Sequence, residues 1–325
     1  MKHIIKRGCF LTLMFMLLGC LSLYAADNDL ITRQITIQLE KAGTLPDRIG
    51  SSRKYTITNL KIIGEINGTD LRMIREMAGS NSTGNSTDGM LSVLDLSEAK
   101  IVEGGDCYYK DHYTSNDVIG SHAFSYCSGL TSLNLPAGIT EIQNDAFRNC
   151  SGLTSLNLPD GITYIVDHAF YGCSGLTSLT LPAGITSIGI GAFYGCRRLT
   201  SLTLPDGIIW IAPDAFNGCF GLTSIYVYAE KVPLIGGNAF AGVDVKKCTV
   251  YVPMGTRDDY RLSGFGDYFE NIVEFEATGI DKTTTSTEVE EVARYSVNGQ
   301  RLSAPTKGLN IVKYSDGSVK KVAVQ

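Results

Sequence analysis

A repeat of 23 residues occupies the middle of this 325-residue chain. Four units follow one another without a gap, starting at the Ala-Phe pairs of Ala123, Ala146, Ala169 and Ala192, and a looser fifth starts at Ala215. The third unit reads AFYGCSGLTSLTLPAGITSIGIG. A unit of this length cannot bury an apolar face alone, so successive coils must stack around one shared core. The period therefore predicts an elongated solenoid.

The positions that stay apolar identify the inward face of each coil. In the first unit they are Ala123, Phe124, Cys127, Leu130, Leu133, Leu135, Ile139 and Ile142. The Leu-x-x-Leu-x-Leu spacing inside this set is the strand signature of a leucine-rich repeat. Pro136 and Gly138 then end the strand and turn the chain. We predict a mainly β leucine-rich-repeat solenoid with short helical turns.

The AFxxCxxLTSLxLPxGITxI units resemble the BspA-like leucine-rich-repeat family of bacterial and some protist surface proteins. The resemblance covers about Leu94 to Phe275. It implies a solenoid that attaches to proteins of a host or of neighbouring cells and has no enzymatic activity.

The start of the chain has the layout of a cleaved signal peptide. Residues 1–26 combine a basic beginning with an apolar run and the small pair Ala25-Ala26. The competing interpretation is a lipid anchor at Cys20, which follows Leu17-Leu18-Gly19. No other apolar stretch of the sequence approaches the length of a transmembrane segment. Both interpretations predict a protein that is secreted or lies on the outer cell surface.

Residues 27–90 are expected to form an α/β cap at the N-terminal end of the solenoid. The patterns predict strands around Ile35–Leu39 and Tyr55–Ile63 and a helix over Asp70–Met77. Thr69 is the expected N-cap of that helix. The stretch Gly79–Gly89 is rich in Gly, Ser, Asn and Thr, which predicts a flexible loop.

The solenoid itself is expected over residues 91–276, with an insertion through Asn116 and a capping helix within Tyr260–Phe269. A polar linker, residues 277–292, precedes a tail over residues 293–325. The tail contains two hairpin signals and predicts a small β-sandwich. Its sequence resembles the C-terminal sorting tails of Bacteroidota surface and secreted proteins, which implies export or retention at the surface. An ordinary β accessory domain is the alternative.

The charge balance disfavours nucleic acid as a partner. Removing residues 1–26 takes away three of the 28 Lys and Arg residues and none of the 33 Asp and Glu residues, which leaves a net charge of −8. The sequence also lacks a dense Lys/Arg cluster of the kind that binds phosphates.

Seven cysteines remain after residue 26, and five of them recur once per repeat: Cys127, Cys150, Cys173, Cys196 and Cys219. Stacked strands lie about 4.8 Å apart, a spacing that permits disulfides. Parallel side chains and an odd number of thiols favour buried free cysteines that act as small hydrophobic residues. The paired C-x-x-C spacings of zinc sites are missing, so we expect neither a metal nor a cofactor.

A second column precedes each Ala-Phe pair and consists of His122, Asp145, His168, Gly191, Asp214 and Asn238. Because Asp, Asn and Gly favour the start of helical turns, we interpret the column as caps for backbone amides rather than as a metal site or proton relay. His112, in the insertion, is expected to be a solvated loop residue. Catalytic motifs such as G-x-S-x-G and H-E-x-x-H are missing from the sequence, so no catalytic residue is predicted.

Two exposed columns are candidates for contact with a partner. One follows the strands from Asn134 and Asn157 to Tyr226, among Thr and Ser residues whose simpler explanation is the strand preference of Thr. The other places Glu141, Tyr164, Ser187 and Trp210 at one repeat position. This position varies between charged, polar and aromatic residues, so it should face solvent, where Tyr and Trp are typical of contact hot spots. The candidate residues are Tyr164, Trp210, Glu141, Asn134, Asn157 and Tyr226.

These observations favour a non-enzymatic surface or secreted protein that binds an extracellular protein or glycan and mediates adhesion to host or neighbouring cells. Two alternatives stay open. One is a surface hydrolase or glycan-processing accessory with its activity in the N-terminal segment or the insertion, since two carboxylates suffice for many glycosidases. The other is a structural spacer.

Overall fold

The computed structural model describes residues 30–275, 291–296, 301–302, 308–314 and 319–324. The chain divides into two compact units, Met1–Glu276 and Ala277–Gln325. The expected signal peptide with Cys20, nearly all of the expected linker and the Asn298-Gly299 turn lie outside the described residues. Among the helices that are described, none is long and apolar enough to cross a membrane.

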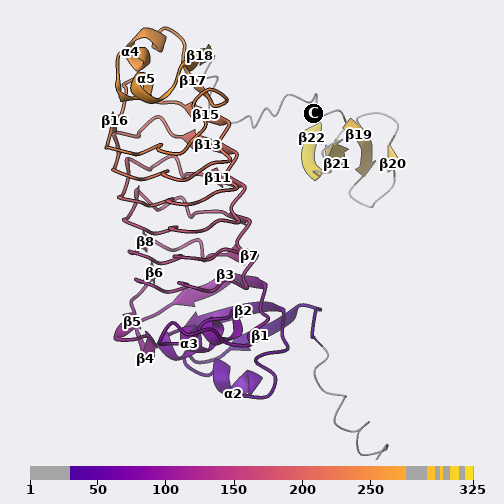
Figure 1. The fold of residues 1–325 in the computed structure, drawn as a ribbon. Helices are drawn as coiled ribbons and strands as arrows, with labels where there is room; N and C mark the ends of the chain where they lie inside the picture. Colours follow the sequence, from indigo (N-terminus) through magenta and orange to yellow (C-terminus); the bar gives the residue numbers. More distant parts are fainter. Residues whose placement is uncertain (1–29, 276–290, 297–300, 303–307, 315–318, 325) are drawn as a thin grey trace, which may run out of the picture. The chain divides into compact units, whose positions relative to one another are not determined.

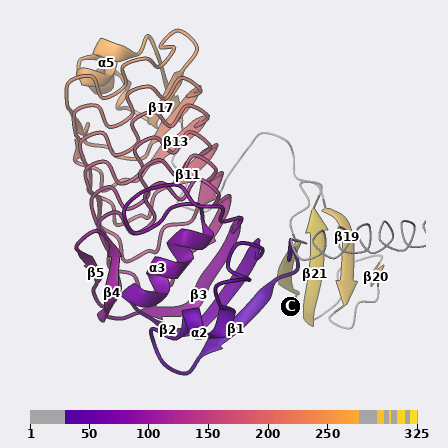
Figure 2. The same cartoon turned by 60° about the horizontal axis from the view of Figure 1, so that its bottom comes forward.

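The N-terminal part of the first unit is a parallel sheet with helices packed beside it (Figure 2). Its elements are β1 (Ile35–Leu39), α2 (Leu45–Ile49), β2 (Asn59–Ile66), α3 (Gly68–Met77) and β3 (Val93–Ile101). The strand predicted at Ile35–Leu39 is confirmed, whereas the second begins at Asn59 instead of Tyr55. Strand β3 pairs with the first repeat strand and aligns Leu94 with Leu133, so the cap continues directly into the solenoid.

The N-cap of α3 is Asn67, and the prediction of Thr69 is wrong. The Asn67 side chain accepts a hydrogen bond from the Thr69 amide at 3.0 Å, while the Asp70 carboxylate accepts one from the Asn67 amide at 2.9 Å. This reciprocal capping box satisfies two amides at the start of the helix. Asp70 also accepts from the amide of Leu45 at 2.9 Å, which fixes the start of α2 against α3.

The Gly79–Gly89 stretch consists mainly of turns without helix or strand, and hydrogen bonds hold part of it. The side-chain oxygen of Asn81 accepts from the amides of Thr83 and Asn85 at 3.0 and 2.9 Å. The Thr87 hydroxyl donates to the carbonyl of Glu76 at 2.6 Å, which joins this segment to the end of α3.

Each coil of the solenoid contributes two short strands, which confirms the predicted leucine-rich-repeat fold (Figure 1). The first strands are β7 (Ser132–Asn134), β9 (Ser155–Leu156), β11 (Ser178–Thr180), β13 (Ser201–Leu204), β15 (Ser224–Val227) and β17 (Thr249–Pro253). The second strands are β6 (Val118–Ile119), β8 (Glu141–Ile142), β10 (Tyr164–Ile165), β12 (Ser187–Ile188), β14 (Trp210–Ile211) and β16 (Leu234–Ile235). Pairing is parallel and joins equivalent residues, as in the series Leu179, Leu202 and Ile225.

Additional elements occur in the insertion and at the C-terminal end of the solenoid. The insertion contains a hairpin of β4 (Gly104–Tyr109) and β5 (His112–Thr114). The single helix expected near the C-terminal end is two helices, α4 (Arg257–Arg261) and α5 (Gly264–Tyr268), followed by β18 (Asn271–Phe275). Phe265 and Phe269 from this cap lie against Phe240 of the last coil, with ring centroids 5.9 and 5.2 Å from it. The cap thereby covers the open end of the core.

A column of stacked phenylalanine rings runs through the core. The column consists of Phe124, Phe147, Phe170, Phe193, Phe216 and Phe240, all buried. Successive ring centroids are 5.1–5.4 Å apart and successive ring planes differ by 2–5°. The rings are parallel because equivalent residues of neighbouring coils repeat the same conformation at the spacing of stacked strands. The aromatic column thus follows from the repeat itself.

Backbone hydrogen bonds also join the coils along the edge formed by the Ala-Phe turns. In each coil, amides of the turn donate to carbonyls of the next coil, as Phe147 does to Ala169 at 2.8 Å. The first coil has the same carbonyls, on Ser121, Ala123 and Ser125, but no earlier Ala-Phe turn precedes it. These carbonyls need other donors, because an unpaired buried backbone group is costly.

Arg75 and Tyr108 supply those donors. The Tyr108 hydroxyl donates to Ser121 at 2.8 Å, and the two terminal nitrogens of Arg75 donate to Ala123 at 3.0 Å and Ser125 at 3.2 Å. Arg75 is fully buried, and all five of its hydrogen bonds go to neutral oxygen atoms. A planar guanidinium suits this task because it offers several donors in one rigid fork. The two side chains replace the amides of a missing coil.

The second unit contains one four-stranded antiparallel sheet. Its strands are β19 (Glu291–Ser296), β20 (Arg301–Leu302), β21 (Gly308–Tyr314) and β22 (Val319–Val324), in the order β20-β19-β21-β22. The two predicted hairpins are present as β19–β20 and β21–β22. Because β19 also pairs with β21, the described strands form a single sheet, and the sandwich stays a prediction.

We predict that Phe170→Ala lowers the free energy of unfolding by about 3–5 kcal/mol, because it leaves a cavity in the middle of the ring column. Urea unfolding followed by the emission of Trp210, the only tryptophan, measures the change. Phe220→Ala is the matched control, since Phe220 is 58% exposed and should cost less than about 1 kcal/mol. Equal losses for the two variants would contradict the role of the column.

We predict that Arg75→Met lowers the free energy of unfolding by about 3 kcal/mol or more, since each buried carbonyl left without a donor costs about 1–3 kcal/mol. Arg72→Met is the control on the same helix, where the side chain is only half-buried. Thermal and urea unfolding of both variants provide the comparison. Similar stabilities would show that the first coil does not depend on Arg75.

Candidate functional site

The repeat cysteines form a column of buried free thiols, as predicted. Four of the five thiols donate to the carbonyl of the phenylalanine one coil earlier, as Cys150 does to Phe124 at 2.9 Å and Cys173 to Phe147 at 3.0 Å. Burial raises the pKa of Cys127 and of Cys219 to about 12. These four thiols therefore have a structural task, since each occupies a second lone pair of a phenylalanine carbonyl.

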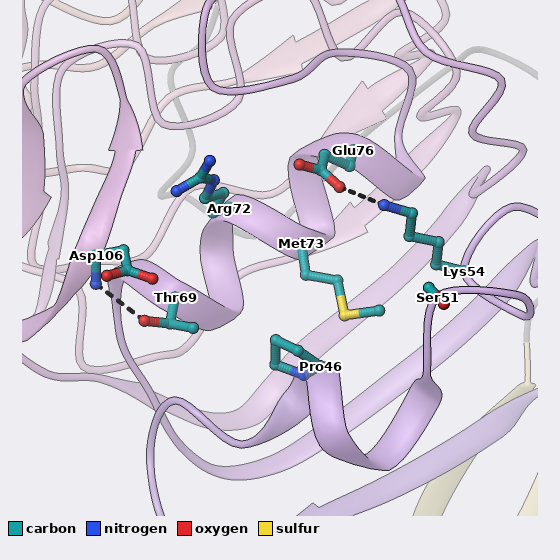
Figure 3. A pocket seen from close by; sticks show the side chains of 8 residues that line it. All are labelled: Pro46, Ser51, Lys54, Thr69, Arg72, Met73, Glu76 and Asp106. Atoms are coloured by element: carbon teal, nitrogen blue, oxygen red, sulfur yellow. Dashed lines mark hydrogen bonds and ion pairs between the residues drawn. The ribbon is translucent and has the colours of Figure 1, made fainter.

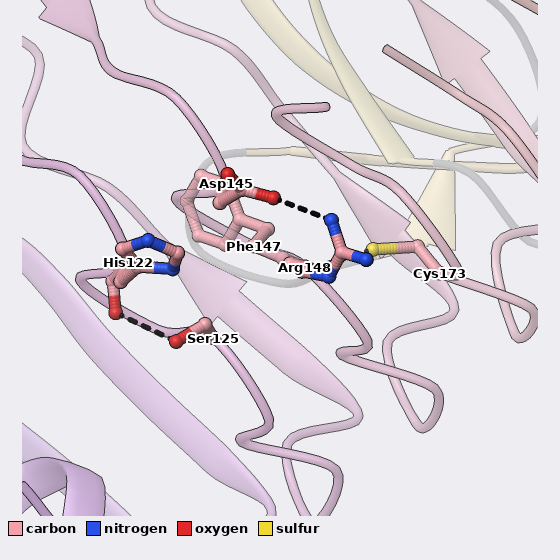
Figure 4. Close-up of polar contacts among 6 residues, drawn as sticks. All are labelled: His122, Ser125, Asp145, Phe147, Arg148 and Cys173. Atoms are coloured by element: carbon pink, nitrogen blue, oxygen red, sulfur yellow. Dashed lines mark hydrogen bonds and ion pairs between the residues drawn. The ribbon is translucent and has the colours of Figure 1, made fainter. Parts of the chain in front are cut away.

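The residues before each Ala-Phe pair share a left-handed backbone, and their interpretation as caps is wrong. Their φ angles lie between 55° and 60°, a region open to Gly and most often occupied otherwise by Asn, Asp and His. The Asp145 carboxylate accepts from the Arg148 guanidinium at 2.8 Å instead of capping an amide (Figure 4). The sequence could have indicated this left-handed backbone, because only these four residue types occur at this repeat position.

His112 is not a solvated loop residue, contrary to the prediction. It lies in β5, half-buried, with its ring centroid 5.3 Å from that of His122 and 6.2 Å from that of Tyr109. Burial lowers the pKa of His122, opposed by the charge of Asp145 and aided by those of His112, Arg75 and Lys110. Within the described residues, no group of three or more His, Cys, Asp and Glu side chains is arranged to hold a metal ion.

The predicted contact residues lie along two different series of strands. Asn134, Asn157 and Tyr226 lie along the first strands, in β7, directly after β9 and in β15. The two asparagines are exposed, whereas Tyr226 is half-buried and stacks on Tyr251 at 4.6 Å. The structure therefore does not bring this set together with Glu141, Tyr164 and Trp210.

The threonines along the first strands connect neighbouring coils. The hydroxyl of Thr154 donates to the carbonyl of Thr131 at 3.0 Å, and that of Thr177 donates to Thr154 at 3.2 Å. The same bond recurs at Thr200 and Thr223, both at 3.1 Å. Because these threonine hydroxyls donate to carbonyls of the neighbouring coil, the recurrence of threonine along the first strands is explained by the stacking of the coils.

The second-strand sheet carries the other candidates in one register. Tyr164 pairs with Ser187, and Ser187 pairs with Trp210, which in turn pairs with Leu234. Tyr164 is 46% exposed, Trp210 37% and Leu234 68%. We call this surface the contact face: the column Glu141, Tyr164, Ser187, Trp210 and Leu234 with the neighbouring exposed side chains of Ile190 and Ile209.

Three residues of the contact face were missed by the sequence interpretation. Leu234 belongs to the looser fifth unit, where the period is lost. Ile190 and Ile209 occupy positions that carry Asp167 and Thr186 one coil earlier. The available signal was this change from polar to aliphatic residues at repeat positions that point outward.

A notch with a volume of about 410 Å³ is present on the contact face. Its lining includes Tyr164, Ser187 and Trp210 of the column, together with Asn144, Asp167 and Ile190 from the turns that follow the second strands. The notch thus combines aromatic, aliphatic and polar side chains from four successive coils.

Comparison with known proteins identifies the type of repeat. Residues 116–250 match the model of the BspA type leucine rich repeat region in six copies. The repeat region is thus similar to the BspA type, over less than half of the chain. No curated protein matches the chain.

Solved structures of leucine-rich-repeat proteins are similar to this chain at low identity. The leucine rich repeat protein of T. pallidum is 24% identical, with 48% of this chain and 80% of that chain covered and a TM-score of 0.35. A leucine rich cell surface protein from Faecalibacterium prausnitzii is 21% identical (67% and 51% covered, TM-score 0.38). The pneumococcal vaccine antigen PcpA is 19% identical (68% and 52% covered, TM-score 0.41). The matched region spans about half the length of the last two proteins.

A second cavity, of about 400 Å³, lies outside the BspA-type repeats, beside α2 and α3 (Figure 3). Its charged lining residues include Lys54, Arg72, Glu76 and Asp106. Lys54 and Glu76 form an ion pair at 2.6 Å, and this hydrogen bond raises the pKa of Lys54. The cavity lies in the N-terminal segment, to which the hydrolase alternative assigns an activity. Its Glu76 carboxylate is ion-paired with the Lys54 ammonium.

For the cysteine column of the BspA-type repeats, we predict that the free energy of unfolding falls as pH rises from about 9 toward 12. The pKa of Cys127 and Cys219 is raised from 9.0 to about 12 in the folded protein. Above pH 9 the unfolded chain therefore binds fewer protons than the folded one, so the stability present below pH 9 is progressively lost. Urea unfolding at pH 7.5 and 10.5 measures this difference.

The double variant Cys127→Ala/Cys219→Ala should show a smaller loss of stability between these two pH values. Cys107→Ala is the control, since Cys107 is half-buried and lies outside the column. An unchanged loss in the double variant would contradict the contribution of the thiols.

Proposed function

We propose that this protein is a non-enzymatic binding protein, secreted or held at the outer cell surface, that attaches to an extracellular protein or glycan through the contact face. The observation that carries the proposal is the register column in which Tyr164, Trp210 and Leu234 are all exposed on one sheet. Exposed apolar groups of this kind, gathered in one place, are typical of interaction sites.

The folded core does not require these side chains. The inward positions of the same strands are occupied by buried isoleucines such as Ile165, Ile188 and Ile211. The outward-facing residues next to these isoleucines differ from coil to coil, as Ser187 and Trp210 do, and the strands still pair. Large apolar side chains that stay partly exposed at such positions gain only part of the stabilisation that full burial provides, which supports a role in binding.

The sheet also holds the candidate side chains in fixed positions before any partner arrives. Strand β14 pairs with β12 and β16, so the backbone under Trp210 is anchored on both sides, and pairing of β10 with β12 anchors the backbone under Tyr164 on one side. Binding to a preorganised surface costs less entropy than binding to a mobile one.

Location outside the cytoplasm is supported by the signal-peptide layout of residues 1–26 and by the resemblance of the tail to sorting tails. The absence of enzymatic activity is supported by the type of repeat.

We expect the double variant Tyr164→Ala/Trp210→Ala to weaken partner binding at least about thirtyfold, because even a single aromatic hot spot contributes about 2 kcal/mol or more. The partner is first captured from extracellular-matrix and bacterial surface extracts and identified, and its affinity for each variant is then measured with purified components.

Asn134→Ala/Asn157→Ala is the matched control, since both asparagines are exposed along the first strands. If this pair abolishes binding and the aromatic pair does not, the binding surface lies along the first strands. Turnover of proteins or glycans by the purified chain would contradict the non-enzymatic assignment.

A further inference from the structure

We propose that the notch of the contact face is a subsite for a neutral glycan, whose alternate pyranose rings pack against Tyr164 and Trp210. The inference rests on the proposed function, that this face binds an extracellular ligand, and names the chemical class of that ligand. It follows from the shape, the size and the charge of the notch.

The notch exists because one coil with small residues lies between two coils with aromatic ones. Ser187 is the register partner of both Tyr164 and Trp210, so it forms a floor between them. Gly189, in the same coil, has no side chain that could fill the notch. A Cβ atom there would lie 2.5 Å from a carboxylate oxygen of Asp167 and 2.6 Å from its amide nitrogen, so no other residue fits without displacing Asp167.

The size of the notch matches a few sugar rings rather than a protein. A volume of about 410 Å³ lies in the range of small-molecule sites, about 300–1,000 Å³. A stable protein partner would cover about 800 Å² of this surface, far more than the notch. Tyr164 and Trp210 are two coils apart, which is about 10 Å at the spacing of parallel strands. Two pyranose rings of a 1,4-linked chain that are separated by one intervening ring lie a similar distance apart, which places the intervening ring over Ser187.

The chemistry of the lining matches the two kinds of surface that a pyranose offers. The C–H bonds on the ring face carry small positive charges and pack on the negative face of an aromatic ring. The hydroxyls at the ring edge need polar partners. Asp167 accepts a hydrogen bond from the Ile190 amide through Oδ1 at 2.7 Å, which fixes the position of this carboxylate in the lining of the notch. Asn144 offers both donor and acceptor groups.

The charge of the residues that line the notch favours a neutral glycan over an acidic one. The residues that line the notch include the carboxylate of Asp167 and contain neither Lys nor Arg. A sulfated or carboxylated sugar would place its anion close to this carboxylate without a cation to compensate for it. The occupant is therefore a neutral glycan.

The test is a titration of the full chain, read through the emission of Trp210, its single tryptophan. The probes are neutral tetrasaccharides of the cello, xylo, manno and chito series and a heparin-derived tetrasaccharide. We expect at least one neutral series to shift the emission saturably, and the sulfated probe to leave it unchanged.

Variants of the notch locate the binding. Ser187→Phe fills the floor while it keeps both aromatic residues, and it should lower the affinity for the neutral sugar at least tenfold. Tyr164→Ala should lower it about tenfold, and Phe220→Ala, an exposed aromatic residue outside the notch lining, should leave it unchanged. Circular dichroism and thermal unfolding check that each variant folds. Should Ser187→Phe fail to fold, Tyr164→Ala still decides the outcome.

The possible failures can be told apart. If no neutral probe binds, while loss of Tyr164 and Trp210 still abolishes capture of a protein partner, the glycan inference is overturned and the proposed function stands. Preference for the sulfated probe, or binding that Ser187→Phe and Tyr164→Ala leave intact, also overturns the inference. If no ligand of any kind depends on the two aromatic residues, the proposed function fails as well.

Discussion

Hydrogen bonding between successive coils is the constraint on which the rest of the structure depends. Each coil has too few internal partners for its backbone, so its amides and carbonyls are paired with the coils on either side. The carbonyl of Phe147 shows how complete the pairing is, because it accepts both the amide of Cys150 and the thiol of Cys173. The one extra residue of the fifth unit leaves this pairing in place, since Trp210 still pairs with Leu234. The threonines and cysteines of the repeat follow from the need to pair each coil with its neighbours.

The two ends of the solenoid face different problems, and the chain solves them with different chemistry. At the N-terminal end, the turn edge of the first coil presents carbonyls, so the cap brings the donors of Arg75 and Tyr108. At the C-terminal end, the ring of Phe240 is the last of the stacked column, and the cap brings the aromatic rings of Phe265 and Phe269. A buried charge is tolerated at the first end because several carbonyl oxygens surround the guanidinium and replace water.

The sequence predicted those features that repeat and missed those that occur once. The inward leucines, the phenylalanines and the thiols were found because five copies reveal which positions stay apolar. Arg75 was not found, because its acceptors are backbone atoms 47 to 50 residues away and leave no pattern of side chains. The left-handed column led to a wrong interpretation because Asn, Asp and Gly favour both helix caps and positive φ. Only the backbone angles distinguish these two causes.

The contact face was predictable as a column of residues, but its shape was not. One repeat position that holds Glu141, Tyr164, Ser187 and Trp210 in turn must face solvent, and this much follows from the period. The notch, in contrast, is a property of several coils together, since its depth depends on how small Ser187 and Gly189 are relative to the rings beside them. A solenoid whose inward and edge positions are all committed to stacking can vary only its outward side chains. Recognition in such a protein is therefore determined by differences between neighbouring coils, whereas the fold is determined by what those coils share.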